Sequence, residues 1–328
     1  MTTTASPDLG QRAETAAQPA APPATTAKPG VPPEVKRVRA LARFATTITI
    51  FNILGHTVLG FEQAPITPIA AALMSYATAL LFEWLDAWAQ GRTPGYAGGF
   101  RSLVVFLLPA HITGLACGML LWGNTSLWPY LFAIAVGNGC KYLVRLRVNG
   151  KLRHVLNPSN TGIAVVLVLF PWVSIAPPYH FTNLTVTALD WLLPLGILMF
   201  GTMLNAKLTG KMPLILGWLG AFAAQAVLRW LLLDHSLLGA LVPMSGLAFI
   251  LFTNYMITDP GSTPSSPRNQ VVFGVTCAAV YAALVLSGIS FGLFFALVIT
   301  CVLRGIVLVA AGMRAARTAV PQQTAGTS

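Results

Sequence analysis

The stretch Ser102-Leu-Val-Val-Phe-Leu-Leu-Pro-Ala-His-Ile-Thr-Gly-Leu-Ala-Cys-Gly-Met-Leu-Leu-Trp122 contains no charged side chain. A helix needs about 20 mainly apolar residues to cross a bilayer, so this stretch predicts a membrane span. Apolar character recurs along the chain, which is 55% hydrophobic and only 9% charged. We therefore predict an all-α polytopic membrane protein with about ten transmembrane helices. The predicted spans are 41–61, 66–85, 102–122, 126–144, 158–175, 187–204, 213–232, 237–257, 270–287 and 290–311.

The positions of the basic residues predict the orientation of these spans. With the N-terminus inside, 18 of the 20 Lys and Arg residues fall in the inner stretches. Arg229 falls at an outer end, and Arg304 lies within the last span. This bias follows the positive-inside rule and places both termini in the cytoplasm. The net charge of +11 is thus explained by orientation and contact with anionic lipid, without a nucleic-acid partner.

The predicted organisation has three parts. Residues 1–35 are rich in Ala, Pro and Thr and predict a disordered cytoplasmic tail. A transmembrane domain follows over 36–312, and 313–328 form a second cytoplasmic tail. Ten spans divide into possible repeats over 41–175 and 187–311. Because each half has an odd number of spans, the two repeats would be inverted relative to each other. Pro109-Ala-His-Ile-Thr-Gly-Leu-Ala116 and Pro243-Met-Ser-Gly-Leu-Ala248 are a faint echo between the halves.

The inner loop before the fifth span predicts a binding site for an anion. Asn157 is a suitable N-cap, and Pro158 suits the first helical position. The opening turn then carries Ser159, Asn160 and Thr161, and a helix N-terminus attracts anions such as a flavin phosphate. The basic cluster before this turn, which includes Arg153, adds positive charge. Helix capping combined with the positive-inside bias is the alternative explanation.

A second inner loop, Tyr255–Asn269, contains several hydroxyl groups, Asp259 and three prolines. Thr258, Asp259 and Arg268 are suitable for a polar ligand, whereas a rigid turn explains the prolines equally well.

Polar residues within the spans predict a pathway for a solute or for protons. His56 and His111 lie deep in the first and third spans, and Glu62 lies near an outer edge. The alternative for each histidine is a hydrogen bond to a neighbouring helix. The four cysteines stand singly without metal-ligand spacing, so no metal site is predicted. Motifs for nucleotide-driven transport, serine hydrolysis and zinc chemistry do not occur in the sequence.

Both inner loops resemble a known family. The segments Asn157-Pro-Ser-Asn-Thr-Gly162 with Leu169-Phe-Pro171, and Met256-Ile-Thr-Asp-Pro260 with Thr263-Pro264, are similar to segments of the RnfD/NqrB family. Its members are ten-span, flavin-bearing components of ion-pumping electron-transfer complexes, the Rnf complexes and the Na⁺-translocating NADH:quinone reductases. Their fold is like that of urea transporters. The resemblance implies a flavin near Asn157, Asn160, Thr258 and Asp259.

A more extensive similarity covers nearly all of the membrane region. It is carried by Phe51-Asn-Ile-Leu-Gly-His-Thr-Val-Leu-Gly-Phe-Glu-Gln63, Phe106-Leu-Leu-Pro-Ala-His-Ile-Thr113, Arg153-His-Val-Leu-Asn-Pro-Ser-Asn160 and Phe170-Pro-Trp-Val-Ser-Ile-Ala-Pro-Pro-Tyr179. These strings resemble the UnbU-type proteins associated with enediyne antibiotic biosynthesis in bacteria. The resemblance implies a multi-pass protein of the bacterial inner membrane, in contact with lipid and with other enediyne biosynthesis proteins.

One departure from the electron-transfer family concerns the flavin. Its members attach FMN to a Ser-Gly-Ala-Thr motif, which this chain lacks. The region where the motif would lie, 176–187, reads differently, so we expect non-covalent rather than covalent FMN. The chain is thus expected to be an electron-transfer membrane protein of enediyne biosynthesis. The alternatives are a transporter or channel for a small solute or the enediyne intermediate, and a scaffold for soluble enzymes.

Overall fold

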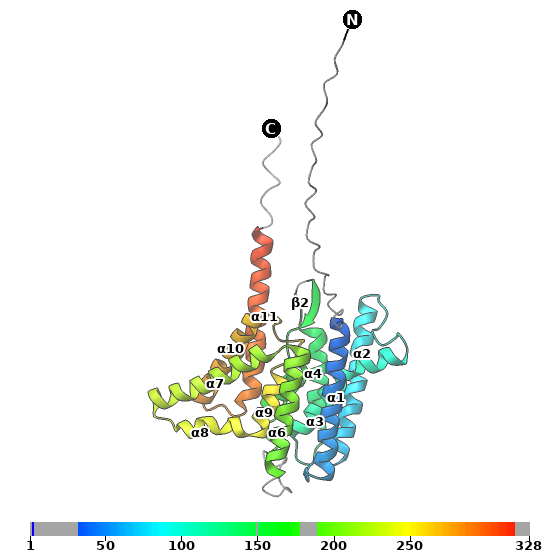
Figure 1. The fold of residues 1–328 in the computed structure, drawn as a ribbon. Helices are drawn as coiled ribbons and strands as arrows, with labels where there is room; N and C mark the ends of the chain where they lie inside the picture. Colours follow the sequence, from blue (N-terminus) through cyan, green and yellow to red (C-terminus); the bar gives the residue numbers. More distant parts are fainter. Residues whose placement is uncertain (1, 3–31, 149, 178–188, 319–328) are drawn as a thin grey trace. The chain divides into compact units, whose positions relative to one another are not determined.

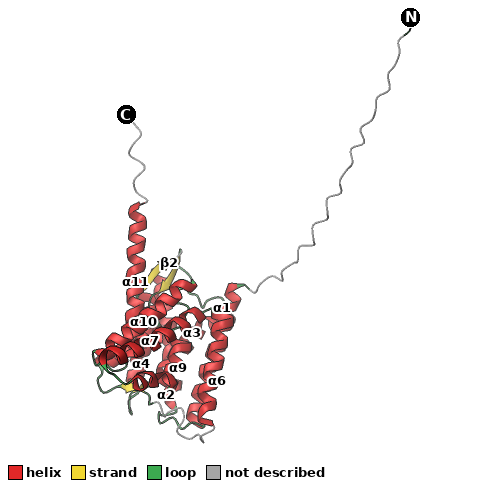
Figure 2. Cartoon of the chain, turned by 60° about the vertical axis from the view of Figure 1, so that its left-hand side comes forward, coloured by secondary structure: helices red, strands yellow, loops and turns green. Residues whose placement is uncertain are grey.

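The computed structural model describes residues 2, 32–148, 150–177 and 189–318. The predicted tail before residue 32 lies outside this part of the chain apart from Thr2, and so does the end of the C-terminal tail. The described residues from Pro33 onwards belong to one compact unit. It is built mainly of helices, as the composition predicts (Figures 1 and 2).

Five helices make up the first half of the unit, and their bounds differ from the predicted spans mainly at the ends. They are α1 (Pro33–Thr57), α2 (Ile66–Ala89), α3 (Phe100–Leu120), α4 (Trp128–Leu143) and α5 (Pro158–Leu169). Helix α1 begins within the predicted disordered tail. Proline suits a first helical position and Glu34 complements the helix dipole, so the helix begins three residues before the predicted boundary at residue 36.

The second half is less regular. It comprises α6 (Leu189–Leu204), the π-helical η2 (Asn205–Thr209), α7 (Met212–Leu233), α8 (Leu237–Leu241), the 3₁₀ turn η3 (Val242–Ser245), α9 (Leu247–Leu251), the π-helical η4 (Phe252–Met256), α10 (Pro267–Leu286) and α11 (Gly292–Thr318). Helix α11 continues beyond the predicted end of the membrane domain at residue 312. The start predicted for the second repeat, residue 187, lies outside the described residues.

Within the described residues, five helices are long and apolar enough to cross a membrane, namely α2, α3, α7, α10 and α11. A bent pair of segments, Leu237–Ser245 and Ala248–Met256, would make a sixth span. These helices indicate a multi-pass membrane protein, whereas the full set of ten spans stays a prediction. Helices α4, α5 and α6 have 16, 12 and 16 residues, and α1 carries a basic first half.

The eighth predicted span is interrupted, because its two segments meet at 65°. Pro243 and Gly246 lie at the break, where neither residue favours continuation of a helix. The matching proline of the first half behaves differently. Helix α3 runs on through Pro109 and packs closely at Gly114, where an added Cβ would lie 2.7 Å from Ala71 O in α2.

Two small antiparallel sheets interrupt the helices. The basic loop after α4 forms a hairpin of β2 (Arg145–Val148) and β3 (Lys151–His154), with Arg145 opposite His154. Strand β1 (Leu121–Trp122) pairs with β4 (Ser174–Ile175), joining the ends of α3 and the α5 segment. The fifth span was predicted to reach residue 175, but α5 ends at Leu169, because Pro171 cannot continue the helical hydrogen bonding.

The order of helix packing is similar in the two halves. Helix α1 packs on α3, α2 on α4, and α4 on α5; correspondingly, α6 packs on α9, α7 on α10, and α10 on α11. Glycines allow the closest approaches. An added Cβ would lie 2.0 Å from Ala133 O at Gly162 and 2.5 Å from Leu214 O at Gly274. Such close backbone packing stabilises helix association in lipid, where the hydrophobic effect gives no driving force between helices.

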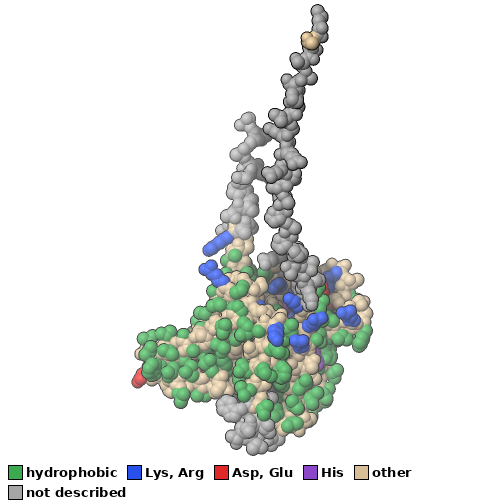
Figure 3. Space-filling model, in the orientation of Figure 1, with side chains coloured by type: hydrophobic (Ala, Val, Ile, Leu, Met, Phe, Trp, Pro, Cys, Tyr) green, Lys and Arg blue, Asp and Glu red, His purple; other side chains and the backbone are tan. Residues whose placement is uncertain are grey.

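The start of α1, the hairpin and the end of α11 lie at the same end of the unit (Figures 1 and 2). Lys and Arg side chains gather at this end on the face drawn in Figure 3, while hydrophobic side chains cover much of the remaining described surface. Many of the exposed side chains are large and apolar, such as Leu73, Leu216 and Val307, which are 62%, 62% and 65% exposed. Such a surface is suited to lipid.

Candidate functional site

The first turn of α5 has the predicted capping geometry. Asn157 is the N-cap, its Oδ1 accepts a hydrogen bond from Asn160 N at 3.1 Å, and Pro158 follows as the first helical residue. Ser159 Oγ donates to the same oxygen at 3.2 Å, and Thr161 Oγ1 donates to Asn157 O at 2.6 Å. The turn therefore satisfies much of its own hydrogen bonding. Its four polar side chains, Asn157, Ser159, Asn160 and Thr161, are all buried.

The second predicted loop lies directly against this turn. Asn157 Nδ2 donates to Met256 O at 2.9 Å, which joins two segments that are far apart in the sequence. Thr258 is buried and donates to Asn254 O. The carboxylate of Asp259 accepts from Gly261 N, Ser262 N and Ser262 Oγ, and so it holds the loop in shape. Arg268, by contrast, is exposed.

Three basic side chains lie near these two segments, and each has only neutral hydrogen-bond partners. Lys141 Nζ donates to Asn138 Oδ1 at 3.1 Å, Lys211 Nζ to Pro264 O at 2.6 Å, and Arg304 Nη1 to Ser262 O at 2.9 Å. Across the described residues, no carboxylate lies within ion-pair distance of any of the three. We call the α5 first turn, the segment 256–264 and the basic side chains Lys141, Arg153, Lys211 and Arg304 the loop junction.

The loop junction has more positive than negative charge. Asp259 attracts Lys141 and Lys211, whereas Arg153 and Arg304 repel Lys211 and each other. Four basic groups thus face one carboxylate, and that carboxylate already accepts three hydrogen bonds. Burying cations without anionic partners is costly, so this arrangement favours the binding of an anion.

Burial changes the protonation of Lys211 markedly. The side chain precedes α7 and is 3% exposed, and desolvation lowers its pKa from 10.5 to about 8. Attraction to Asp259 opposes this change, and repulsion by Arg304 and Arg153 adds to it. At neutral pH the ammonium group is still mainly charged, so it remains available to an anion.

A second charged cluster nearby is balanced and has a structural role. Arg92 bonds both Glu83 and Asp86, and Arg145 of β2 makes a bidentate contact with the Asp86 carboxylate. Tyr142 donates to Glu83 at 3.3 Å. Two carboxylates therefore match two guanidinium groups. This cluster connects the end of α2 to the hairpin and has no charge left for a ligand.

We expect Asp86→Asn to destabilise the protein by about 1–3 kcal/mol, because charge-assisted hydrogen bonds to two arginines are weakened at once. Thermal unfolding of the detergent-solubilised chain measures the effect. Glu62→Gln is a suitable control, since Glu62 is exposed. Equal unfolding temperatures for the two variants would show that the cluster does not hold the hairpin.

The structure thus brings six predicted site residues together, namely Asn157, Ser159, Asn160, Thr161, Thr258 and Asp259, with Arg153 on the adjacent β3. The sequence alone did not identify Lys211 and Arg304 as site residues. From the sequence, Lys211 was interpreted as one of many inner-loop cations, and Arg304 as a residue within a span. The isolated guanidinium of Arg304 in an apolar helix was a usable signal, because such a charge requires a polar partner.

The predicted pathway residues lie apart from the loop junction, along α1 and α3. Both ring nitrogens of His111 have partners on neighbouring helices: Thr49 Oγ1 lies 2.7 Å from Nε2, and Tyr76 Oη lies 2.5 Å from Nδ1. His56 lies two turns beyond Thr49 on α1, and its Nδ1 is 2.9 Å from Asn52 O. Glu62 is exposed in the following loop. His111 therefore has the predicted alternative role, a hydrogen bond between helices.

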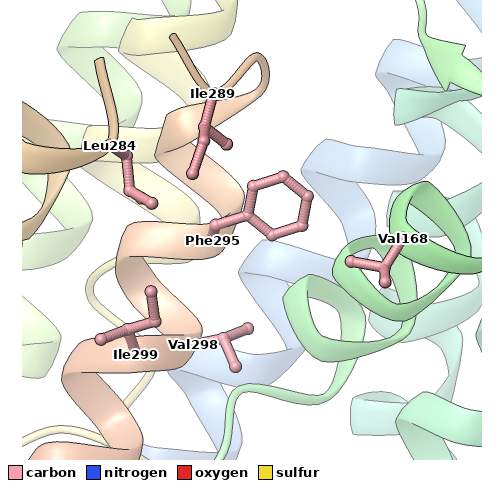
Figure 4. Close-up of a pocket in the computed structure, with 6 residues that line it drawn as sticks. All are labelled: Val168, Leu284, Ile289, Phe295, Val298 and Ile299. Atoms are coloured by element: carbon pink, nitrogen blue, oxygen red, sulfur yellow. The ribbon is translucent and has the colours of Figure 1, made fainter. Parts of the chain in front are cut away.

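The cysteines and the described pocket add no polar chemistry. All four cysteines are free and buried, and no group of ligating side chains with metal-binding potential occurs among the described residues. An open surface pocket of about 260 Å³ lies between α5 and the α10–α11 segment. Val168 faces Phe295 and Val298 across it, and Leu284, Ile289 and Ile299 complete an entirely apolar lining (Figure 4).

A comparison with known protein families finds no family model that matches this chain, and a comparison with curated proteins finds no match.

Proposed function

We propose that this chain is a membrane protein of enediyne natural-product biosynthesis that holds FMN non-covalently at the loop junction and takes part in electron transfer. The observation that carries the FMN site is a set of three cations with neutral hydrogen-bond partners only, of which Lys211 is buried and Lys141 and Arg304 are half-buried. Lys211 and Arg304 bond to backbone carbonyls, and the phosphate of FMN is an anion that such groups hold well. The pathway assignment rests on the sequence resemblance to UnbU-type proteins.

The residues of the loop junction fit a flavin nucleotide in a second respect. Asn160 Oδ1 is fully buried and has no hydrogen-bond partner, while its Nδ2 donates to Phe294 O at 2.9 Å. An unpaired buried acceptor is costly and suits a ligand that carries an N–H donor, as the flavin ring does. When bound, the flavin supplies the ability to accept and release electrons. The chain's own residues hold its phosphate and restrict its access to water.

In the proposed arrangement the two halves of the membrane domain are inverted repeats in the bacterial cytoplasmic membrane. The similar order of helix packing in both halves supports the repeats. The gathering of Lys and Arg at the end that carries the start of α1 and the end of α11 supports a cytoplasmic location for that end and for the loop junction. Ten spans, lipid contact and docking of other enediyne proteins at this basic end complete the proposal.

Visible absorption and mass analysis of the purified full chain, before and after acid precipitation, test this function. We expect a flavin that is released into the supernatant, and we expect added FMN to bind more tightly than riboflavin, which lacks the phosphate. A protein that contains no flavin and binds no added FMN would overturn the proposal. A flavin that stays with the precipitate would overturn its non-covalent form.

FMN binding should weaken as pH rises through about 8, because Lys211 loses its positive charge there. The stability of the FMN-free protein should change in the opposite direction. Between about pH 8 and pH 10.5, Lys211 keeps its proton in the unfolded chain but releases it in the folded chain, because its folded pKa is about 8. Rising pH therefore favours folding through this group. FMN titrations and thermal unfolding at pH 7 and 9 measure both effects. In Lys211→Met, both the loss of FMN affinity and the gain in stability between pH 7 and 9 should be smaller than in the parent protein.

A second candidate function, transport of a small solute, is supported by the polar stripe on α1. Thr49, Asn52 and His56 follow one another on the side of α1 near α3, and Glu62 is exposed beyond them. Solute uptake into proteoliposomes that is lost in His56→Ala and retained in Glu34→Gln would favour transport over electron transfer.

A further inference from the structure

The C-terminal end of α1 contains hydrogen-bond acceptors that have no donor. Asn52 is 4% exposed, its Nδ2 donates to Ile48 O at 2.8 Å, and its Oδ1 is buried without a partner. His56 lies one turn further along. Since its Nδ1 contacts the carbonyl oxygen of Asn52, which only accepts, Nδ1 must carry the proton. In the neutral ring, Nε2 is then an acceptor, and it is also buried without a partner.

Gln63 supplies a third acceptor from the loop that follows α1. Its Nε2 donates to Leu121 O at 2.6 Å, its side chain is buried, and its Oε1 lacks a partner. The Tyr130 hydroxyl lies near this amide but does not form a hydrogen bond with Oε1. That hydroxyl instead accepts from Gly123 N at 2.9 Å.

The end of α3 contacts Asn52 and Gln63, and the Phe61 ring contacts His56. Asn52 Nδ2 approaches Met119 Sδ at 4.0 Å, and Gln63 bonds to Leu121, only two residues further on. Phe61 lies over Gly55, and its ring centroid is 5.5 Å from that of His56. We call Asn52, His56 and Gln63 the acceptor site.

We propose that the acceptor site binds a small ammonium-type cation, either ammonium itself or the head of a primary amine. Three buried acceptors without a donor require a ligand that donates several hydrogen bonds. A neutral imidazole nitrogen is a poor ligand for alkali cations, which prefer oxygen, but it accepts well from N–H. The exposed carboxylate of Glu62 in the same loop attracts a cation.

This inference is independent of the proposed flavin site and stands whether or not the loop junction binds FMN. The α1–α3 groups and the loop junction share no residue. Binding at the acceptor site also requires no transport, so a failed uptake assay leaves it intact.

Thermal unfolding of the full chain in detergent near pH 7 tests the site, with chloride salts compared at equal ionic strength. We expect ammonium and methylammonium to raise the unfolding temperature in a saturable manner. Tetramethylammonium, which is cationic but has no N–H, and sodium and potassium should give no saturable increase. An equal response to sodium or tetramethylammonium would overturn the hydrogen-bonding argument, and no response to ammonium would indicate that water alone fills the site.

The variants Asn52→Leu and Gln63→Leu separate binding from folding. Each replaces a buried amide by an apolar side chain of similar size and removes an unpaired acceptor together with one donated hydrogen bond. The two changes oppose each other in stability, so both variants should fold. We expect each to lose at least tenfold in its apparent affinity for ammonium. Thr57→Val is the matched control, because Thr57 is exposed on the same helix and should keep the full response. A full response in both leucine variants would overturn the assignment.

Discussion

Replacement of Gly162 by alanine should destabilise the protein by about 3 kcal/mol, because it overpacks the closest helix contact in the described structure. An added Cβ would lie 2.0 Å from Ala133 O and 2.8 Å from Ala133 C. Both atoms belong to the backbone of α4, so no side-chain rotation relieves the clash and α5 has to move. Thermal unfolding and size-exclusion chromatography of the purified variant measure the loss of folded protein.

The matched control is Gly220→Ala. Gly220 is also helical, but an added Cβ there meets nothing within 4 Å. Alanine has a higher helix propensity than glycine by up to about 1 kcal/mol, so this variant should be as stable as the parent or slightly more stable. Similar unfolding temperatures for the two variants would show that α4 and α5 do not depend on this contact.

Lys211→Met should weaken FMN binding about 10- to 100-fold, since a charge-assisted hydrogen bond to a phosphate is worth about 1.5–3 kcal/mol. Arg304→Met should have an effect of similar size, because its guanidinium reaches the same loop through Ser262 O. Riboflavin binding should change little in either variant, because riboflavin carries no phosphate. Fluorescence titration with FMN and with riboflavin measures both affinities.

Lys207→Met is a suitable control for these variants. Lys207 lies four residues before Lys211 but is exposed, so its replacement removes an equal charge away from the loop junction. Equal weakening of FMN binding in Lys207→Met and Lys211→Met would indicate a diffuse effect of net charge. Equal weakening of riboflavin binding in Lys211→Met would indicate that the lysine does not act on the phosphate.

Local signals in the sequence were sufficient to predict part of the structure. The order Asn157-Pro158 predicted a capped helix start, because both residues act within one turn, and the structure confirms it. The apolar segments predicted helices for the same reason. The hairpin of β2 and β3 was missed, although Arg145–Val148 and Lys151–His154 largely alternate basic and apolar residues on either side of Asn149-Gly150. Its attachment to α2 depends on the distant carboxylate of Asp86, which no local pattern indicates.

The loop junction was only partly predictable. Asn157 and Asp259 stood out, since each shapes the chain next to it. Lys211 and Arg304 acquire their role through carbonyl groups 53 and 42 residues away, and no local pattern reports such contacts. The interruption near Gly246 was also hard to place, because a proline at the corresponding point of α3 leaves that helix continuous.

The short helix α5 has a consequence for the surrounding bilayer. Twelve helical residues span only about 18 Å, compared with about 30 Å for the hydrocarbon core of a bilayer. A segment shorter than the hydrocarbon core requires either a locally thinner bilayer or cover from its protein neighbours. Because the first turn of α5 is buried against the end of η4, protein neighbours supply that cover at this end.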